Sequence, residues 1–426
     1  MNEEVRSMRG VEKFGPNFER IRRDIVSLSK FTSAKETGYT RISFSEEDRE
    51  ARKHVAQLMG SEAKLQVRID AAGNLIGRRE GKKKGPVILM GSHIDTVRGG
   101  GRFDGVSGVI AAVEVLRRFE EKGVETLLPV EAVVFLAEEP SPFGISTVGS
   151  RGMAGELSEE ILASLKDDRG RTLGMAIREM GGDPARIDEA RRSSDDVLAY
   201  LELHIEQGPL LFTQGIPIGI VTGIVGISRG KIEVIGSSDH PGTTPMEGRK
   251  DALVAGSEVI LALEKVCKGL GRVVGTIGKI EVYPNSLNVI PGIVTLGMEI
   301  RGLGEALLDQ AISLFKAELD QIANKRGVVI NLETAVTMKP AIFTAGMVER
   351  IVWVCERHNI PYMKMASGAG HDATHMAEIV PAGMIFIPSK DGKSHCPEEW
   401  SEFEHICLGA EILASTIVKM DREETQ

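Results

Sequence analysis

The chain has 426 residues, of which 42% are hydrophobic and 27% are charged, a composition typical of folded globular proteins rather than disordered ones. This length predicts two or three domains, or one large domain with an insertion. The formal net charge is −9, with 52 Lys plus Arg against 61 Asp plus Glu, and this balance argues against nucleic acid as a partner. The 4 cysteines form no Cys-x-x-Cys pair, so no disulfide framework is expected, and a reducing, cytoplasmic location fits best.

The N-terminal part is predicted to be helical and to carry no targeting segment. Met1–Lys13 is charged and has no apolar core, so it does not resemble a signal peptide. Residues 15–31 and 46–59 are expected to form helices, the second beginning with Ser45 and Asp48 at the spacing of a capping box. The longest apolar runs are too short to span a bilayer, so no membrane partner is expected.

After these helices, short apolar runs alternate with helical stretches. The runs are Val87–Met90, Val130–Ala137, Val197–Leu203 and Gly383–Ile387. The helical stretches are Gly105–Phe119, 346–358 and 402–419. Continuous apolar runs are typical of strands that are buried on both faces. The alternation therefore predicts an α/β fold with a mostly parallel sheet.

The middle of the chain has a different order of elements. It predicts two strands within Ile218–Ile235, a helix over Arg249–Leu270, strands over Val273–Val282 and Val289–Arg301, a helix over Glu305–Lys325 and a strand over Val328–Val336. This order is the split βαβ arrangement of an α+β unit. We expect residues 217–338 to be an inserted domain, and residues 1–216 with 339–426 to form the main domain.

Histidine and carboxylate side chains follow the apolar runs where each predicted strand ends. They are His93, Asp95, Asp104, Glu138, Glu139, His204 and His395. The carboxyl ends of parallel strands meet at the crevice where open α/β sheets bind ligands. Taken singly, a histidine at a strand end is more often a structural residue, and a Glu-Glu pair is more often solvated surface. Their joint placement favours one shared site.

Imidazole and carboxylate ligands suit one or two divalent ions of Zn, Mn, Co or Ni. Asp104, at the start of a helix, is the plausible bridging ligand for two ions. Adjacent Glu138 and Glu139 cannot both point the same way on an extended chain, so one is expected to bind metal and the other to act as general base. Asp95 is placed to orient the ring of His93. From the residues alone, the chain is predicted to be a dinuclear metallohydrolase.

Longer segments make this pattern more specific. They are Gly91–Val97, Gly100–Val106, Gly149–Arg151, Glu202–Pro209, Pro284–Gly292, Ser367–Ala373 and Ser394–His395. With the glutamate pair they resemble, from about residue 15 to 418, the amidase/carbamoylase branch of the M20 metallopeptidase superfamily. That branch contains N-carbamoyl-L-amino acid hydrolases, allantoate amidohydrolases and β-ureidopropionases. His204 is the discriminating position, because peptidase members usually carry a carboxylate ligand there.

The resemblance implies two divalent metal ions per subunit, held by two sets of ligands that share a carboxylate. One set is His93, Asp104 and His204, and the other is Asp104, Glu139 and His395. It also implies that Glu138 is the general base for a metal-activated water and that Asp95 orients His93. The family fold, a metal-binding α/β domain with a smaller lid and dimerisation domain, agrees with the predicted elements.

The resemblance further implies a set of substrate contacts. His240, within Asp239–Met246, would reach across a homodimer and stabilise the developing oxyanion. Asn288 and Arg301 match the positions that grip a substrate carboxylate, and the planar Arg fork suits that group. Gln207 is expected to line the same pocket. The implied partners are thus a second copy of the chain and a small ureido or amide substrate that bears a carboxylate.

Two segments depart from the family pattern close to the expected substrate position. Pro140–Pro142 stands where the family usually has Gly-Ser-Arg after the glutamate pair. Asp239 and Pro241 flank His240 where the family usually has Asn and Ala. Because the metal ligands are complete, hydrolysis is expected and the exact substrate is left open.

The predicted activity is hydrolysis of an N-carbamoyl-L-amino acid to the amino acid, ammonia and CO2. The alternatives within the same chemistry are an allantoate amidohydrolase and an N-acyl-amino acid deacylase or dipeptidase. The alternative from another class is a catalytically silent metal-binding scaffold. Glu138 and His395 argue against that scaffold, because both would be dispensable in it.

Overall fold

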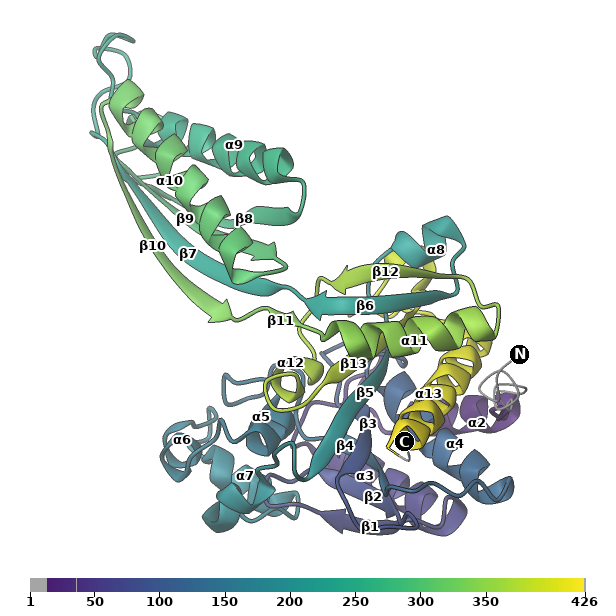
Figure 1. Ribbon diagram of the computed structural model, residues 1–426. Coiled ribbons are helices and arrows are strands. Elements are labelled where there is room, and N and C mark those ends of the chain that lie inside the picture. Colours follow the sequence, from purple (N-terminus) through teal and green to yellow (C-terminus); the bar gives the residue numbers. More distant parts are fainter. Residues whose placement is uncertain (1–13, 36, 425–426) are drawn as a thin grey trace. The chain divides into compact units, whose positions relative to one another are not determined.

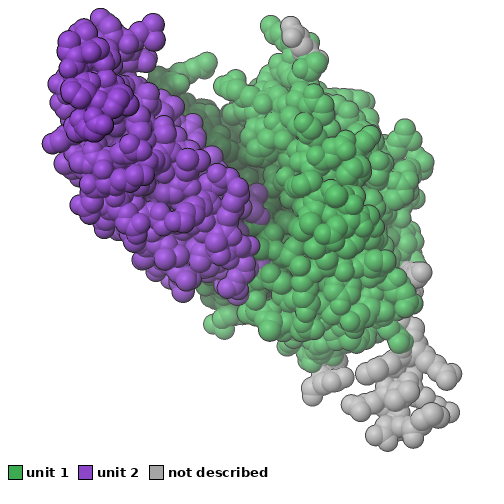
Figure 2. All heavy atoms as spheres, turned by 90° about the horizontal axis from the view of Figure 1, so that it is seen from above, with its two compact units in different colours: residues 1–222, 343–367, 371–426 green, residues 223–342, 368–370 purple. Residues whose placement is uncertain are grey.

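The computed structural model describes residues 14–35 and 37–424 (Figure 1). Met1–Lys13 lies outside the described residues, so the structure does not test the expectation that this segment is not a signal peptide. The chain divides into two units, which Figure 2 colours green and purple. Unit 1 is residues 1–222, 343–367 and 371–426, and unit 2 is residues 223–342 and 368–370. The insertion of residues 217–338 as a separate folding domain stays a prediction.

The larger sheet has nine strands in the order β1-β2-β4-β3-β5-β13-β6-β11, with β12 beside β6. Its strands are β1 (Gln66–Ile69), β2 (Leu75–Arg79), β3 (Val87–His93), β4 (Val130–Phe135), β5 (Val197–Ile205), β6 (Ile218–Ile224), β11 (Ala341–Ile342), β12 (Tyr362–Ser367) and β13 (Ala382–Ile387). The four central strands, β4, β3, β5 and β13, are parallel. The pairs β1–β2, β2–β4, β13–β6 and β6–β11 are antiparallel. The predicted α/β fold with a mainly parallel central sheet is confirmed.

The helices of unit 1 are α2 (Phe18–Leu28), α3 (Glu46–Gln57), α4 (Val106–Glu121), α5 (Val148–Ala154), α6 (Glu159–Ser164), α7 (Leu173–Glu179), α8 (Leu210–Gln214), α11 (Ala345–Arg357), α12 (Ala373–Met376) and α13 (Phe403–Glu423). Of these, α4, α5, α11, α12 and α13 pack on the central strands of the sheet. A π-helical turn, η1 (Leu58–Glu62), and two 3-10 turns, η2 (Pro184–Ala190) and η3 (Lys390–Gly392), complete the unit. Helices α4 and α13 pack on each other and on the strands, and α5 and α12 do so on the opposite side in Figure 1.

Local sequence explains where these elements begin and how deeply they lie. Every residue of β3, β4 and β13 is buried, as expected for continuous apolar runs between helix layers. Ser45 accepts the N–H of Asp48 at the start of α3. The Asp48 carboxylate reaches back to the N–H of Phe44 instead of Ser45, so the capping box is displaced by one residue.

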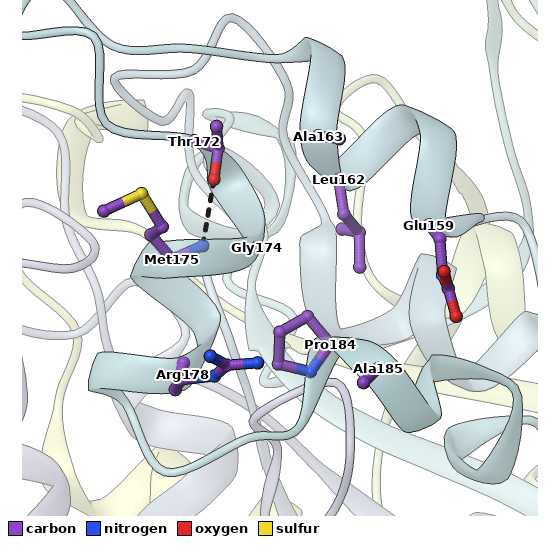
Figure 3. A pocket seen from close by; sticks show the side chains of 9 residues that line it. All are labelled: Glu159, Leu162, Ala163, Thr172, Gly174, Met175, Arg178, Pro184 and Ala185. Carbon is purple, nitrogen blue, oxygen red and sulfur yellow. Dashed lines mark hydrogen bonds between the residues drawn. The ribbon is translucent and has the colours of Figure 1, made fainter.

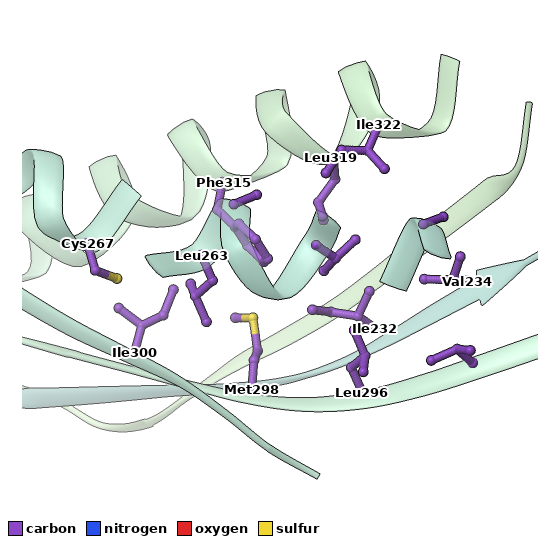
Figure 4. Packing of buried hydrophobic residues seen from close by; sticks show 14 of the residues in the cluster. Ile232, Val234, Leu263, Cys267, Leu296, Met298, Ile300, Phe315, Leu319 and Ile322 are labelled. Carbon is purple, nitrogen blue, oxygen red and sulfur yellow. The ribbon is translucent and has the colours of Figure 1, made fainter. Parts of the chain in front are cut away.

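Unit 2 contains the split βαβ arrangement. Its elements are β7 (Gly226–Ile235), α9 (Ala252–Leu270), β8 (Val273–Tyr283), β9 (Ile293–Gly302), α10 (Glu305–Arg326) and β10 (Val329–Met338). The antiparallel sheet has the order β10-β7-β9-β8. Alternate residues of β7 and β9, such as Ile232, Leu296 and Met298, pack under Phe315 of α10 and Leu263 of α9 (Figure 4). The other of the two strands expected within 218–235, β6, pairs with β13 in the larger sheet.

A small helical lobe of unit 1 was not predicted from the sequence. Helices α5, α6 and α7 with η2 share an apolar core that includes Leu136, Val148 and Ile177. The lobe carries a pocket of ≈ 270 Å³ lined by nine described residues, none of them histidine or cysteine (Figure 3). None of the helices in the described part of the chain is long and apolar enough to cross a membrane.

Candidate metal centre

The four parallel strands bring the predicted ligands to one edge of the larger sheet. Strand β3 ends at His93, and His204 is the penultimate residue of β5. Glu138 and Glu139 follow β4, and His395 follows β13 after η3. Because β4, β3, β5 and β13 are neighbours with parallel pairing, their carboxyl ends lie side by side.

The first candidate metal group consists of His93, Asp104 and His204, all buried, with ligand atoms within 4.8 Å of one another. Asp104 Oδ1 lies 3.2 Å from His204 Nε2 and 3.5 Å from His93 Nε2. The other nitrogen of each ring faces a backbone carbonyl. Nδ1 of His93 faces the carbonyl of Asp95, and Nδ1 of His204 faces the carbonyl of Ile205. Both Nε2 atoms therefore point toward the same carboxylate oxygen.

The second candidate group consists of Asp104, Glu139 and His395. His395 Nε2 lies 3.2 Å from Asp104 Oδ2 and 3.5 Å from Glu139 Oε1. Asp104 thus offers one oxygen to each group, which is the arrangement expected of a bridging carboxylate. The side chain of His395 is 48% exposed, so this group opens toward solvent whereas the first is closed.

Glu138 belongs to neither group but lies beside the first. Its Oε2 is 3.7 Å from His93 Nε2, and the residue is 9% exposed. Glu138 thus lies beside the first group while Glu139 belongs to the second, and their separate roles as base and ligand stay predictions. Burial raises the pKa of Glu138 well above its ordinary value, and the negative charge of Glu139 adds to this rise.

Asp95 holds the glutamate pair as well as facing His93. Its Oδ1 lies 3.5 Å from His93 Nδ1, close to the contact expected of an orienting carboxylate. Its two oxygens accept the backbone N–H groups of Glu138 at 3.2 Å and Glu139 at 3.1 Å. One buried side chain thus joins the end of β3 to the segment after β4, a contact that the spacing of these residues does not predict.

The donor set fits divalent metal ions. Burial and the neighbouring Asp104 raise the pKa of Glu139 to about 7. Burial would raise the pKa of Asp104 as well, but hydrogen bonds from His204, His395 and His93 hold it well below its ordinary value. A divalent cation would neutralise such crowded carboxylates and accept the imidazole nitrogens as ligands.

Glu399 holds two loops of the candidate centre together and is a residue that no sequence pattern predicts. Its Oε1 accepts the N–H groups of Phe103 at 2.9 Å and Asp104 at 3.1 Å, and its Oε2 accepts the Ser394 hydroxyl at 2.9 Å. A side chain on Gly101 would collide with it, because a Cβ there would lie 2.0 Å from Glu399 Oε1. Glu399 therefore joins the loop of Asp104 to the loop of His395.

We expect Glu399→Gln to weaken metal binding by about 10- to 100-fold, because an amide oxygen cannot replace both acceptor oxygens. Metal titration of the stripped protein by calorimetry measures this directly. Glu398→Gln, a change at the exposed neighbouring glutamate, is the matched control. Equal affinity in both variants would contradict the supporting role of Glu399.

Gln207, predicted to line the substrate pocket, contacts two of the candidate metal ligands. Its Nε2 lies 2.7 Å from Asp104 Oδ2 and 3.3 Å from His395 Nε2. Its backbone φ of 58° is left-handed, and its N–H is held by Ser389 Oγ. The buried Oε1 has no hydrogen-bond partner among the described residues.

His371 is a further buried side chain at the centre to which the sequence argument gave no role. It lies in Ser367–Ala373, where Ser367 Oγ contacts its Nε2 at 2.8 Å. Its ring packs edge-on against His204, with centroids 4.5 Å apart. With Glu202 and His204 it forms a third group of ligand-type atoms. The Gly-His-Asp sequence was the available signal.

The remaining predicted residues, His240, Asn288 and Arg301, lie in unit 2. His240 Nδ1 accepts the N–H groups of Gly242 at 3.1 Å and Thr243 at 3.2 Å, so the ring proton is on Nε2. Arg301 donates to Glu299 through Nε and to the carbonyl of Gly368 through Nη1, both at 2.7 Å. Asn288 Oδ1 accepts the Ser286 hydroxyl at 2.6 Å. The substrate contacts of these three residues stay predictions.

Comparison with known proteins places these observations among related chains. The model of peptidase family M20/M25/M40 matches residues 89–419. An N-carbamoyl-L-amino acid amidohydrolase of Geobacillus stearothermophilus is 40% identical over 95% of this chain and 99% of that protein. A ureidoglycolate hydrolase of Oryza sativa is 34% identical over 96% of this chain and 86% of that protein. The crystal structure of a hydantoinase/carbamoylase family amidase from Burkholderia ambifaria superimposes with a TM-score of 0.89, at 33% identity over 96% of this chain and 98% of that one.

Proposed function

This chain belongs to the peptidase M20/M25/M40 family, and from that membership we propose that it hydrolyses N-carbamoyl-L-amino acids. At the coarser level it is a metal-dependent amidohydrolase that acts on carbon–nitrogen bonds other than peptide bonds. The observation that carries the proposal is that Asp104 is shared between two candidate metal groups, while Glu138 lies beside them and belongs to neither. That arrangement would provide metal ligands and a separate base side by side at one edge of the sheet.

Two divalent ions per subunit, of Zn, Mn, Co or Ni, are part of the proposal. His93, Asp104 and His204 would hold one, and Asp104, Glu139 and His395 the other. When bound, such ions polarise the substrate carbonyl and make water acidic enough to be deprotonated near neutral pH.

The residues of the chain then have separate tasks in the reaction. Glu138 takes a proton from the attacking water and later delivers it to the leaving amino nitrogen as the ureido C–N bond breaks. His240 offers Nε2–H to the developing oxyanion, because its Nδ1 is already an acceptor. The released carbamate breaks down to ammonia and CO2, so one water yields the amino acid, ammonia and CO2.

Arg301 is proposed as the anchor of the substrate carboxylate, with Asn288 and Gln207 beside the substrate. Glu299 and the Gly368 carbonyl fix its guanidinium. Arg301→Ala is expected to raise KM about 10- to 100-fold, the effect of losing a charge-assisted bond pair. Steady-state kinetics with Arg229→Ala as control checks this, since Arg229 also pairs with Glu299. An unchanged KM would remove Arg301 from the substrate site.

The deciding experiment measures the release of ammonia and of free amino acid by Mn- or Co-loaded protein on a panel of substrates, because acyl and peptide substrates release an amino acid but no ammonia. The panel holds N-carbamoyl-L- and D-amino acids, allantoate, ureidoglycolate, β-ureidopropionate, N-acetyl amino acids and dipeptides. Turnover of N-carbamoyl-L-amino acids alone supports the proposal. Preference for allantoate or ureidoglycolate keeps the class and replaces the substrate, and turnover of acyl or peptide substrates alone replaces both. Silence with metal bound would favour the scaffold alternative.

A homodimer formed through unit 2 is also part of the proposal. The four cysteines are free thiols, which fits a reducing environment. Strand β8 is the edge of the unit 2 sheet, with exposed apolar side chains that include Val274, Ile280 and Tyr283. An edge of this length readily pairs with a second copy. Multi-angle light scattering tests it, and a monomeric mass at working concentration would contradict it.

A further inference from the structure

The backbone that carries Glu138 is fixed from both sides. Its N–H is held by Asp95, and its carbonyl accepts the N–H of Thr147 at 2.9 Å. The carbonyls of Ala137 and Leu136 accept the next two N–H groups, those of Val148 and Gly149, at 3.0 and 2.7 Å. The N-terminus of α5 is thus bonded residue by residue to the segment that ends in the glutamate pair.

Thr147 adopts an unusual conformation at this junction. Its φ is 54° and its ψ 37°, in the left-handed region, and it is 6% exposed. A β-branched residue is a genuine outlier there, and such conformations persist only where the surroundings over-determine them. Ala137, on the other side of the loop, has a φ of 53°. The geometry around Glu138 therefore depends on what holds Thr147.

The side chain of Thr147 is held by a buried histidine. Thr147 Oγ1 lies 2.9 Å from Nε2 of His375, and the Nδ1 of that ring lies 2.5 Å from Glu156 Oε1. A carboxylate only accepts, so Nδ1 donates to Glu156 and Nε2 forms the hydrogen bond with the Thr147 hydroxyl. Arg151 closes the group, donating to Thr147 Oγ1 at 3.1 Å and to Glu156 at 2.7 Å.

This group joins two short helices. Thr147 is the N-cap of α5, and His375 lies in α12, which follows directly after the His371–Asp372 pair. A second bond, Ser150 Oγ to Asp372 Oδ1 at 2.6 Å, runs between the same helices. Helix α12 therefore acts on the segment of Glu138 through α5, although the two are more than two hundred residues apart in the chain.

We propose that His375 is a positioning residue, which with Glu156 holds the Thr147 hydroxyl and thereby fixes the backbone of Glu138. The inference rests on the proposed role of Glu138 as general base. His375 touches none of the candidate metal ligands in the contacts described for it, so its effect is separate from metal binding.

The first test is hydrogen exchange of the holoenzyme, which does not depend on turnover. His375→Ala and Thr147→Val are expected to speed amide exchange in peptides covering residues 136–149 by about tenfold or more, because the bonds of Thr147, Val148 and Gly149 open more often. Thr147→Ser keeps the hydroxyl and is expected to behave as the parent protein. Glu189→Ala, at an exposed glutamate of the same unit, is the control. Unchanged exchange in both test variants would overturn the proposal.

The second test is kinetic. His375→Ala and Thr147→Val are expected to lower kcat by about 10- to 100-fold with KM changed less than about twofold, since a misplaced base affects the transition state alone. Metal content stays at the parent value, and the double variant is no worse than either single one. Additive losses, or loss of metal together with kcat, would overturn the proposal. If Thr147→Val fails to fold, Glu156→Ala at the half-exposed end of the group replaces it. An inactive parent protein refutes the proposed function, and the exchange result still decides this inference.

Discussion

Glu138→Gln is expected to lower kcat by about 10²- to 10⁴-fold, the contribution of a positioned general base, while metal content stays unchanged. The amide has the shape of the carboxylate but takes no proton from water. Metal binding is preserved because Glu138 belongs to neither candidate metal group. The measurement pairs ammonia release under saturating substrate with elemental analysis of the same preparation.

Glu139→Gln is the matched comparison, one residue along the chain. Glu139 lies in the group with Asp104 and His395, so its loss is expected to lower metal content as well as turnover. The two variants thus distinguish the loss of a base from the loss of a metal ligand, although the backbone N–H groups of both residues donate to the Asp95 carboxylate. Undiminished turnover in Glu138→Gln, or metal loss equal to that of Glu139→Gln, would assign the base elsewhere.

The sequence was informative where function depends on the ends of strands. Continuous apolar runs marked β3, β4, β5 and β13, and the side chains after them met at one edge because parallel strands must place them there. The separate roles of Glu138 and Glu139 were inferred from extended-chain geometry, and the structure places only Glu139 in a candidate metal group. In unit 2, the order of strands and helices sufficed to predict the split βαβ arrangement, since each element had a clear period.

The supporting contacts were not predictable in the same way. Glu399 meets Phe103 and Asp104 across almost three hundred residues, and His375 meets Thr147 across more than two hundred. Nothing in the local sequence distinguishes these side chains from surface residues, because their burial is created by packing between distant segments. Asp95 shows the same limit: its spacing from His93 suggested one contact, and the fold adds two more with the glutamate pair.

Pro140–Pro142, the segment that differs from the family pattern, lies in the loop between Glu139 and Thr147. Ser141 bonds Ile145 through its backbone N–H, and Phe143 packs edge-on against Phe44 with centroids 5.3 Å apart. The proline-flanked turn is therefore anchored in the apolar core of the helical lobe. We expect this loop, which directly follows the proposed base and metal ligand, to influence which substrates are accepted, and the substrate panel tests that expectation.

Asp104→Asn is expected to empty both candidate metal groups and to lower turnover roughly a thousandfold or more, because the ions supply several kcal/mol of transition-state stabilisation. Asp104 Oδ1 faces His93 and His204, and Oδ2 faces His395. The amide keeps the volume of the side chain, and the backbone N–H of residue 104 stays bonded to Glu399. The fold is therefore retained while the shared ligand is lost.

His395→Ala separates a bridging ligand from an ordinary one. His395 belongs only to the second group and is half-exposed, so its removal is expected to lower metal content by about one half, leaving a closed first group. If Asp104 bridges the two ions, elemental analysis after equal dialysis gives a lower metal content for Asp104→Asn than for His395→Ala. Equal partial losses would mean that Asp104 serves one ion alone, and that Glu139 with His395 holds its ion without it. The contrast tests the one feature on which the two-metal proposal depends, a single carboxylate with an oxygen for each group.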